Sequence, residues 1–441
     1  MNSSTTSTMK KIIISIICLN LYFGFSQQTP AEDQNKTIAI VGGTTHVGNG
    51  NTIENSAIIF KDGKITLVAD MATIRIDMRD MQVINAGGKH IYPGFIVPNS
   101  TLGLVEIDAV RASDDEREIG TMNPHIRSII AYNAESKVVE SMRPNGVLMG
   151  QITPRGGRIS GTSSIVQFDA WNWEDAVIKE NDGIHINWPN TFVRGRWWMG
   201  ESDNLKPNKS YSKQVEDLSQ FIISAKAHNT KPTSSHLPFE AMKSVIDKSS
   251  RLFFHVNDEK GIRDVIHFTK KHDLGSVTIV GGAESHLVKE ILKKNNISVL
   301  LRRVHSLPVN EDDAIDLPFV TAKILDDAGI LVGLETSGDM ERMNSRNLPF
   351  YAGTVAAHGV EKENALSMIT LNTAKILGID KTYGSIEIGK QATLFISDGD
   401  ALDMRTNKVS HAFIDGRKIS LETHQTQLWK KYSNKFKAEK K

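Results

Sequence analysis

The chain has 441 residues, of which 39% are hydrophobic and 23% charged, and its formal net charge is +1. This length suffices for one large barrel with a smaller second domain, and the composition is that of an ordinary globular protein. A net charge so close to zero gives no general electrostatic basis for binding nucleic acid or an anionic membrane, so we expect no nucleic-acid partner.

The N-terminus has the composition of a targeting segment. Two lysines precede the apolar residues 12–25, and Gly24 and Ser26 are small residues at the two positions that a signal peptidase reads. We therefore expect residues 1–26 to be a signal peptide, and the protein to be exported to the periplasm or the extracellular space without stable membrane insertion. A retained anchor is the alternative, although the stretch is short for a span. Cys18 is the only cysteine, so the exported protein would have no disulfide and no thiol nucleophile.

Short strands separated by turns are predicted near both ends of the chain. Apolar residues mark them, in chain order, at 37–41, 57–60, 64–68, 392–396 and 411–414. Lys61-Asp62-Gly63, between the second and third of these strands, is a hairpin signal. Neither set can bury a core by itself, so we expect residues 37–91 and 379–421 to pack into one small β-sandwich, with residues 27–36 as a linker.

The middle of the chain predicts a different architecture. Amphipathic helices are expected at 215–227, 238–248, 259–272 and 285–294, and they alternate with apolar runs at 252–254, 277–280, 299–301 and 330–333. Such alternation implies a parallel sheet, and its length predicts an α/β fold with a (β/α)8 TIM-like barrel over residues 92–378. Between 100 and 200 the pattern is less regular: strands are expected at 146–152 and 164–168, but the helices between them are short or missing.

A basic helix is predicted over residues 422–441. Leu428, Trp429, Tyr432 and Phe436 fall on one face of it, with lysines around them. We expect this face to dock on the domain, and a membrane-binding element is the alternative.

Residues 89–101 read Lys-His-Ile-Tyr-Pro-Gly-Phe-Ile-Val-Pro-Asn-Ser-Thr, which resembles the first barrel strand of the amidohydrolase superfamily. Three segments extend the resemblance: 346–353, the small-residue helix at 365–374, and the Gly-Ser-Ile-Glu-Ile-Gly-Lys turn at 384–390. The chain is similar to the imidazolonepropionase-related branch over about residues 37–421. The resemblance implies a metal-dependent hydrolase fold that acts on carbon–nitrogen bonds.

The resemblance also implies a metal site that has lost ligands. The superfamily's first strand ends in His-x-His, where this chain has Asn99 and Thr101, and its strand-6 histidine corresponds to Gly281. What remains is His255 at the end of strand 5, as a candidate metal ligand together with Asp339 or Glu335 near strand 8. We therefore expect a degenerate site that holds either one divalent metal, such as zinc, or none.

Two further roles follow from position. Asp339 occupies the place of the family's general base, so it is the predicted catalytic residue. Residues 153–164 form a glycine-rich loop with two arginines, which could hold an anionic substrate through backbone N–H groups and a guanidinium, or could be a structural turn. Arg158 and Asn99 are the predicted substrate-binding residues.

Two functions remain open. The first is an exported amidohydrolase-like hydrolase with an atypical metal site, acting on a non-peptide C–N bond, a small cyclic amide or a dipeptide. The second is a catalytically inactive protein of this fold that binds a small molecule or pairs with an active relative. We favour the enzyme, because the resemblance is to enzymes, although fold alone does not establish function. Either protein could form a homo-oligomer.

Overall fold

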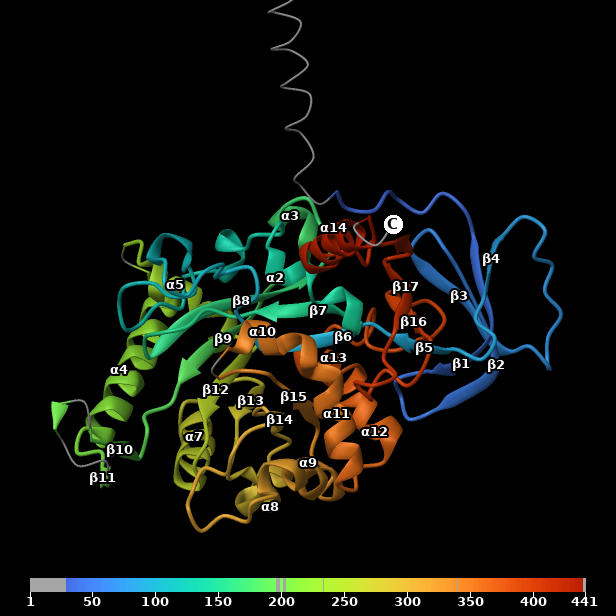
Figure 1. Ribbon diagram of the computed structural model, residues 1–441. Coiled ribbons are helices and arrows are strands. Elements are labelled where there is room, and N and C mark those ends of the chain that lie inside the picture. The colour runs from blue at the N-terminus through green and yellow to red at the C-terminus, as the bar shows by residue number, and fades with distance from the viewer. Residues whose placement is uncertain (1–28, 196–198, 201–203, 233, 339, 439–441) are drawn as a thin grey trace, which may run out of the picture. The chain divides into compact units, whose positions relative to one another are not determined.

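The computed structural model describes residues 29–438 except 196–198, 201–203, 233 and 339 (Figure 1). The predicted signal peptide, residues 1–26, therefore lies outside the described residues, and so does Asp339. Within the described part of the chain, none of the helices combines the length and the apolar character that a membrane span requires.

The first sheet combines both ends of the chain. Its strands are β1 (Ile38–His46), β2 (Thr52–Lys61), β3 (Lys64–Asp70), β4 (Gln82–Asn85), β5 (His90–Pro93), β16 (Leu394–Ser397), β17 (Val409–Ile414) and β18 (Arg417–Lys418). Their order is β18-β17-β16-β5-β1-β2-β3, with β4 also paired to β1. The antiparallel pair of β5 and β16, in which Tyr92 lies opposite Phe395, joins the two ends. The prediction that the two β segments pack together is confirmed.

The second sheet is the barrel. Its strands are β6 (Phe95–Ser100), β7 (Val147–Ile152), β8 (Ile159–Gln167), β9 (Val177–Asn187), β12 (Arg251–Val256), β13 (Val277–Gly281), β14 (Ser298–Leu301) and β15 (Val332–Leu334). They neighbour one another in chain order, and all pairs are parallel except the two that β8 makes. The predicted TIM-like barrel is confirmed, with β8 reversed. Residues 153–158 are too few for a parallel crossover, so β7 and β8 can only form an antiparallel hairpin.

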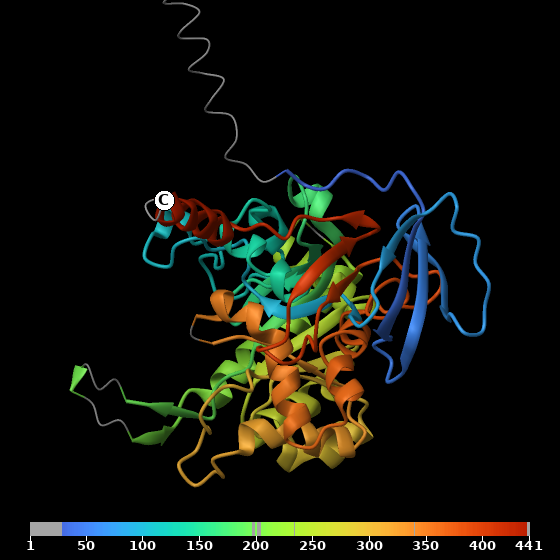
Figure 2. The same cartoon turned by 45° about the vertical axis from the view of Figure 1, so that its right-hand side comes forward.

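Most of the helices belong to the regular half of the barrel. They are α4 (Tyr211–Thr230), α5 (Leu237–Ala241), α6 (Lys243–Ile246), α7 (Glu259–Lys271), α8 (Lys289–Lys294), α9 (Leu317–Asp327), α10 (Glu341–Asn344), α11 (Leu348–Ala357), α12 (Lys362–Ser367) and α13 (Leu371–Leu377). The irregular half has only α2 (Lys137–Glu140) and α3 (Trp173–Ala176). Single 3-10 turns lie at Arg111–Ser113, Ser128–Ala131, Arg143–Asn145, Ser285–Val288 and Ser345–Asn347. A two-stranded arm, β10 (Phe192–Arg194) with β11 (Leu205–Pro207), extends from the barrel (Figure 2).

Because side chains point alternately into and out of the barrel along each strand, a layer of apolar side chains fills part of its interior. One residue from each of six strands forms a buried layer: Ile96, Met149, Ile165, Phe253, Val280 and Leu300. Ile376 and Leu377 of α13 join this layer and complete it. Because the interior is packed at this level, the space above this layer, at the C-terminal ends of the parallel strands, is separated from the opposite end of the barrel.

The barrel is nearly closed rather than fully closed. No ladder joins β6 to β15 among the described strands. Instead, the chain after α12 fills the gap, where Ile96 N donates to the Ile369 carbonyl at 3.0 Å and Leu334 N donates to the Met368 carbonyl at 3.2 Å. The backbone groups at the seam are thus satisfied without direct pairing.

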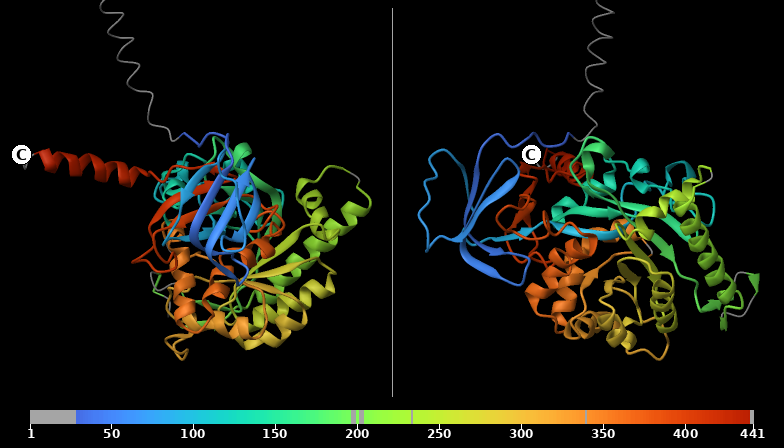
Figure 3. Two further views of the ribbon diagram at one scale, coloured as in Figure 1. Left: turned by 90° about the vertical axis from the view of Figure 1, so that its right-hand side faces the viewer. Right: turned by 180° about the vertical axis from the view of Figure 1, so that it is seen from behind.

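The C-terminal helix α14 (His424–Ala438) does not dock as predicted. Leu428, Trp429, Tyr432 and Phe436 are 38%, 68%, 51% and 58% exposed. The chain packs against the barrel core only as far as Leu421, and Thr423 is the last buried residue before the helix begins. The helix then extends away from the barrel (Figure 3). Its apolar face therefore has no partner within the described chain.

A buried ion cluster ties distant segments together. Asp169, just after β8, lies 3.1 Å from Arg143 Nη1 and 3.1 Å from Arg417 Nη1 of β18. The Asp169 carboxylate also accepts a hydrogen bond from the Ala31 backbone N–H at 2.9 Å. The side chains of Asp169 and Arg143 are only 1% and 3% exposed. One carboxylate thus holds the start of the described chain, the barrel and the C-terminal strands.

We expect Asp169→Ala to lower the free energy of unfolding by about 3–5 kcal/mol, because it leaves two arginines without their buried counter-charge. Urea denaturation followed by circular dichroism measures this change. Asp80→Ala, at an exposed position, is the matched control and should leave the midpoint unchanged. Equal midpoints for both variants would show that the cluster contributes nothing to stability.

Candidate functional site

A polar layer lies directly above the apolar layer of the barrel. Side chains alternate along a strand, so the residue two positions after each interior apolar residue also points inward. These residues are Gln151 on β7, His255 on β12, and Arg302 directly after β14. β9 contributes His185, and Glu335 directly follows β15. On the reversed β8 the corresponding residue, Ser163, comes two positions before Ile165. The barrel therefore changes from apolar to polar at one level, toward the C-terminal ends of its parallel strands.

A hydrogen-bonded chain runs through this layer. Ser163 Oγ donates to Asp182 Oδ1 at 2.5 Å, and His185 Nε2 lies 2.9 Å from Ser163 Oγ. His185 Nδ1 then lies 2.9 Å from His255 Nε2. Because the serine proton points to Asp182, His185 must donate from Nε2 and accept at Nδ1. His255 is thereby held with its proton on Nε2, which leaves Nδ1 as an acceptor.

Burial keeps both histidines neutral. Burial, and then the nearby charge of Arg155, lower the pKa of His255 to about 3. The pKa of His185 is also well below its usual value, because of burial and then of the neighbouring His255. Burial raises the pKa of Asp182, although hydrogen bonds from Ser163 and Gln151 oppose the shift. The hydrogen-bonded series from Asp182 to His255 thus ends in a neutral imidazole rather than in a cation.

Arg155 organises the opposite side of the layer. Its guanidinium donates to Asn99 Oδ1 at 3.0 Å, to the Asn99 carbonyl at 2.8 Å, and to both oxygens of Glu341 at 3.1 Å. Glu341 Oε1 also accepts from the backbone N–H and hydroxyl of Thr101, at 3.0 and 2.7 Å. Asn99 and Thr101, which stand where the resemblance implies His-x-His, are therefore both hydrogen-bonded within this network.

Glu335 lies beneath Asn99 and is fully buried. Its Oε2 accepts from Asn99 Nδ2 at 3.2 Å and from the Ser337 backbone N–H at 2.7 Å, whereas Oε1 has no hydrogen-bond partner. Burial raises the pKa of Glu335, and the hydrogen bonds from Ser337 only partly oppose this shift. A carboxyl group in such surroundings can hold a proton closer to neutral pH than an exposed glutamate can.

A cavity of about 370 Å³ opens above these residues. Asn99, Arg155, His255, Ser337 and Glu341 all line it. Its rim also carries charged pairs, in which Arg342 contacts Asp108 and Arg117 contacts Glu116. The cavity thus has room for a small molecule in direct contact with both networks.

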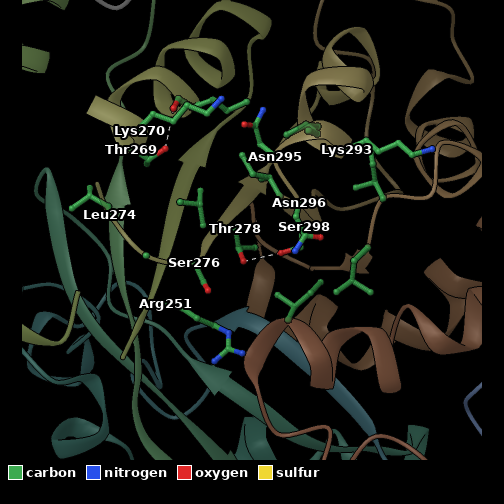
Figure 4. A pocket seen from close by; sticks show the side chains of 18 of the residues that line it. Arg251, Thr269, Lys270, Leu274, Ser276, Thr278, Lys293, Asn295, Asn296 and Ser298 are labelled. Carbon is green, nitrogen blue, oxygen red and sulfur yellow. Dashed lines mark hydrogen bonds between the residues drawn. The ribbon is translucent and has the colours of Figure 1, made fainter. Parts of the chain in front are cut away.

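A larger cavity, of about 600 Å³, lies at the other end of the strands (Figure 4). Arg251, Val277 and Ser298, which line it, are the first residues of β12, β13 and β14. Thr278 and Ser298 are hydrogen-bonded to each other there at 2.9 Å. Barrel chemistry is found at the C-terminal ends of strands, so we assign the site to the smaller cavity.

The structure brings together some of the predicted site residues. Asn99 and His255 line the cavity, and Glu335 lies below it. Arg158 is not among the cavity-lining residues, because its guanidinium donates to the Asn187 carbonyl at 2.6 Å. Arg155, the other arginine of the same loop, reaches the cavity instead. The role of Asp339 stays a prediction, because that residue lies outside the described part of the chain.

Three functional candidates were missing from the sequence prediction. They are His185 and Asp182 on β9, and Glu341 at the start of α10. His185 carries a signal that could have been used, since it follows Gly183-Ile184 as His255 follows its own apolar run. Glu341 carries no such signal, because its partners Thr101 and Arg155 are 240 and 186 residues away.

The residues present do not fit the family's metal. Among the described residues, no group of three or more His, Cys, Asp or Glu side chains could hold a metal ion. The ring nitrogens of His185 are both engaged, with Ser163 and with His255. Gly281, where the family has a histidine, has a φ of +96°, and a Cβ there would lie 2.6 Å from Asn257 Oδ1. In this layer the described residues therefore offer hydrogen-bonding groups and no set of three metal ligands.

The neutral histidine pair predicts how stability depends on pH. Below pH 6.5 the unfolded chain takes up protons that His185 and His255 do not bind when folded, so stability falls as pH decreases. Each histidine should contribute a slope of about 1.4 kcal/mol per pH unit. We expect His185→Gln with His255→Gln to flatten the dependence of the unfolding free energy on pH between about pH 6 and 4.5.

His267→Gln, at an exposed position on α7, serves as the control for this measurement and should keep the wild-type slope. Urea titrations at each pH give the unfolding free energies. A double variant with an unchanged slope would mean that the two buried histidines do bind protons in the folded state.

The chain resembles known proteins in sequence. Residues 223–419 match the family model described as the amidohydrolase family. The amidohydrolase tasK of Hapsidospora irregularis is 23% identical over 376 residues, which cover 74% of this chain but only 37% of that protein. An imidazolonepropionase of Flavobacterium johnsoniae is 21% identical over 384 residues, which cover 78% of this chain and 86% of that protein.

A solved structure extends the likeness to the fold. An amidohydrolase from Thermotoga maritima MSB8 superposes with a TM-score of 0.75 at 21% identity, covering 86% of this chain and 99% of that one. The family model matches the regular half of the barrel, from α4 onward, whereas Asn99 and Thr101 lie outside the matched residues. The predicted resemblance is confirmed: residues 223–419 match the amidohydrolase family model, and over most of its length the chain has the fold of the Thermotoga maritima amidohydrolase.

Proposed function

We propose that this protein hydrolyses a C–N bond in a small molecule, such as a non-peptide amide, a small cyclic amide or a dipeptide. The observation that carries the proposal is the polar layer beneath the 370 Å³ cavity, where a neutral histidine and a buried carboxyl group of raised pKa lie at the C-terminal ends of barrel strands. The match of residues 223–419 to the amidohydrolase family model supports the reaction class.

The chemistry needs a base and a proton donor. Water adds its oxygen to the carbon of the C–N bond, one water proton passes to the base, and the nitrogen leaves with a proton as the bond breaks. Among the described residues, Glu335 is the carboxyl group suited to hold that proton, because burial raises its pKa. Asn99 and Ser337 both contact Glu335 and line the cavity, so Glu335 lies directly behind the cavity wall.

His255 supplies an oriented acceptor on the other side of the cavity. The Asp182–Ser163–His185 chain fixes its proton on Nε2, so Nδ1 can accept a hydrogen bond from water or from a substrate N–H. An imidazole of such low pKa stays neutral through the reaction. We therefore assign His255 the role of positioning water or substrate. We assign Asp182 the role of holding the hydrogen bonds of Ser163, His185 and His255 in one arrangement.

The second function, an inactive protein that binds a small molecule or pairs with an active relative, has a specific observation in its favour. Asn99 and Thr101 replace two family ligands, and both are already hydrogen-bonded to Arg155 or Glu341. A site satisfied by its own side chains gains less from binding water in a reactive position. Homo-oligomer formation stays a prediction from the sequence.

Export is part of the proposal and rests on the sequence of residues 1–26 alone. The two lysines and the apolar residues 12–25 fit a signal peptide. N-terminal sequencing of protein recovered from outside the cytoplasm would test it, with Gln27 as the expected first residue. Recovery of the chain with Met1 intact in the cytoplasmic fraction would contradict export.

Glu335→Gln should lower kcat/KM by about 100-fold or more, since the amide cannot take up the proton. Glu54→Gln, at an exposed position on β2, is the matched control and should keep full activity.

The wild-type kcat/KM should fall as pH decreases, with an apparent pKa above the ordinary value of 4.5, because the base must be ionised. The assay is steady-state hydrolysis of a panel of cyclic amides and dipeptides.

Asp339→Asn tests the base predicted from the sequence in the same assay. Loss of turnover in Asp339→Asn with full activity in Glu335→Gln would assign the base to Asp339 and contradict the role of Glu335. Absence of hydrolysis across the panel, together with saturable binding of one panel member, would favour the inactive binding protein.

The metal content of the purified protein distinguishes a site that binds a metal from one that does not. We expect less than one equivalent of zinc or a similar metal in protein desalted without chelator, because the described residues offer no group of three ligands. Elemental analysis measures it, and activity before and after chelator treatment shows whether any bound metal matters. A full equivalent, lost in His255→Gln, would mean that Asp339 completes a rebuilt site.

A further inference from the structure

The helix α14 leaves an apolar stripe uncovered. Leu428, Trp429, Tyr432 and Phe436 fall within an arc of about 100° around the helix axis. All four side chains are exposed, Trp429 at 68%. Aromatic side chains of this size are normally buried or held at an interface. The stripe therefore marks a surface whose partner lies outside the described part of the chain.

The start of the helix is fixed to the barrel, so the stripe is not a detached tail. The His424 backbone N–H donates to the buried Glu140 carboxylate at 2.6 Å, and Thr423 with Thr426 forms the N-terminal cap. Leu421, just before the helix, packs against the barrel core. The helix is held at one end and presents its remaining length to the surroundings (Figure 3).

Lysines border the stripe on both sides. Lys431 and Lys435 follow one edge, whereas Lys437 and Lys430 lie further around the helix beyond the other edge, and all four are exposed. Lys430 also pairs with Glu422, which precedes the helix, at 2.5 Å. No acidic residue lies between His424 and Ala438. The near-neutral charge of the whole chain gives no general attraction to an anionic surface, but this helix concentrates positive charge around an apolar face. That combination matches a lipid interface, where aromatic rings enter the headgroup region and lysines meet anionic headgroups.

Self-association fits the same helix less well. Two copies pairing through the stripe would bring lysines of one helix beside lysines of the other, with no acidic residue on either helix to pair with them. An anionic bilayer supplies both the apolar layer and the negative charge. We propose that α14 binds the protein peripherally to membranes that contain anionic lipids, lying in the plane of the interface.

The test is flotation with vesicles of phosphatidylglycerol and phosphatidylcholine, compared with pure phosphatidylcholine. Protein beginning at Gln27 is used, because Ala31–Lys441 forms one compact unit and the apolar residues 12–25 would themselves partition into lipid. We expect binding to the anionic vesicles, little binding to the neutral ones, and release at about 0.5 M NaCl. Absence of binding to either vesicle would overturn the proposal.

Two variants locate the contact on α14. Trp429→Ser with Phe436→Ser should lower the partition coefficient about tenfold or more, and so should replacing the four helix lysines by glutamine. The matched controls are Trp171→Ser, whose ring is 63% exposed elsewhere, and glutamine at four exposed lysines: Lys209, Lys231, Lys271 and Lys294. Equal loss in controls and helix variants would overturn the proposal. So would a dimer, seen by sedimentation velocity without lipid, that Trp429→Ser with Phe436→Ser dissolves.

Discussion

The site depends on the contacts of one guanidinium group, that of Arg155. It joins Asn99, at the end of the first barrel strand, to Glu341, which begins α10 after the last strand. These two strands share no ladder, so Arg155 spans the place where the barrel is not closed by backbone pairing. A charge-assisted, forked contact is suited to this task, because it fixes both partners in orientation as well as distance. Arg155 reaches that position because β7 and β8 are joined by a hairpin whose loop lies at the barrel mouth.

The regular half of the barrel could be predicted from the sequence, and the irregular half could not. From about residue 210 on, each apolar run is short, each helix is amphipathic, and the predicted strands at 252–254 and 299–301 lie within β12 and β14. In the other half, β9 was missed because Lys179 to Asp182 interrupts its apolar pattern. The buried Asp182 accepts a hydrogen bond from Ser163, which in turn contacts His185. These contacts form only in the folded barrel, so the sequence pattern does not report them. The reversal of β8 could be inferred only from the length of the loop before it.

The residues of the candidate site also differ in whether the sequence could predict them. His255 and Asn99 were found because they stand at the ends of recognisable strands. Arg155 and Arg158 could not be distinguished in the sequence, since they share one loop. Two glycines between them, Gly156 and Gly157, both have positive φ, and the turn that they allow sends the two guanidinium groups to different partners. The pairing of Thr101 with Glu341 joins residues 240 positions apart, which no local pattern reports.

The raised pKa of Glu335 reflects how little its surroundings compensate a buried negative charge. A buried carboxyl group needs a compensating cation or a proton. Asn99, in place of a ligand histidine, offers Glu335 only an amide hydrogen bond. Arg155 lies close enough to oppose the shift, but its guanidinium is already bonded to both oxygens of Glu341. Arg302, in the same polar layer, also interacts with Glu335, yet burial still raises the pKa of this carboxyl group. The site thus contains a carboxyl group able to exchange a proton nearer to neutral pH, which is the property that general acid–base catalysis requires.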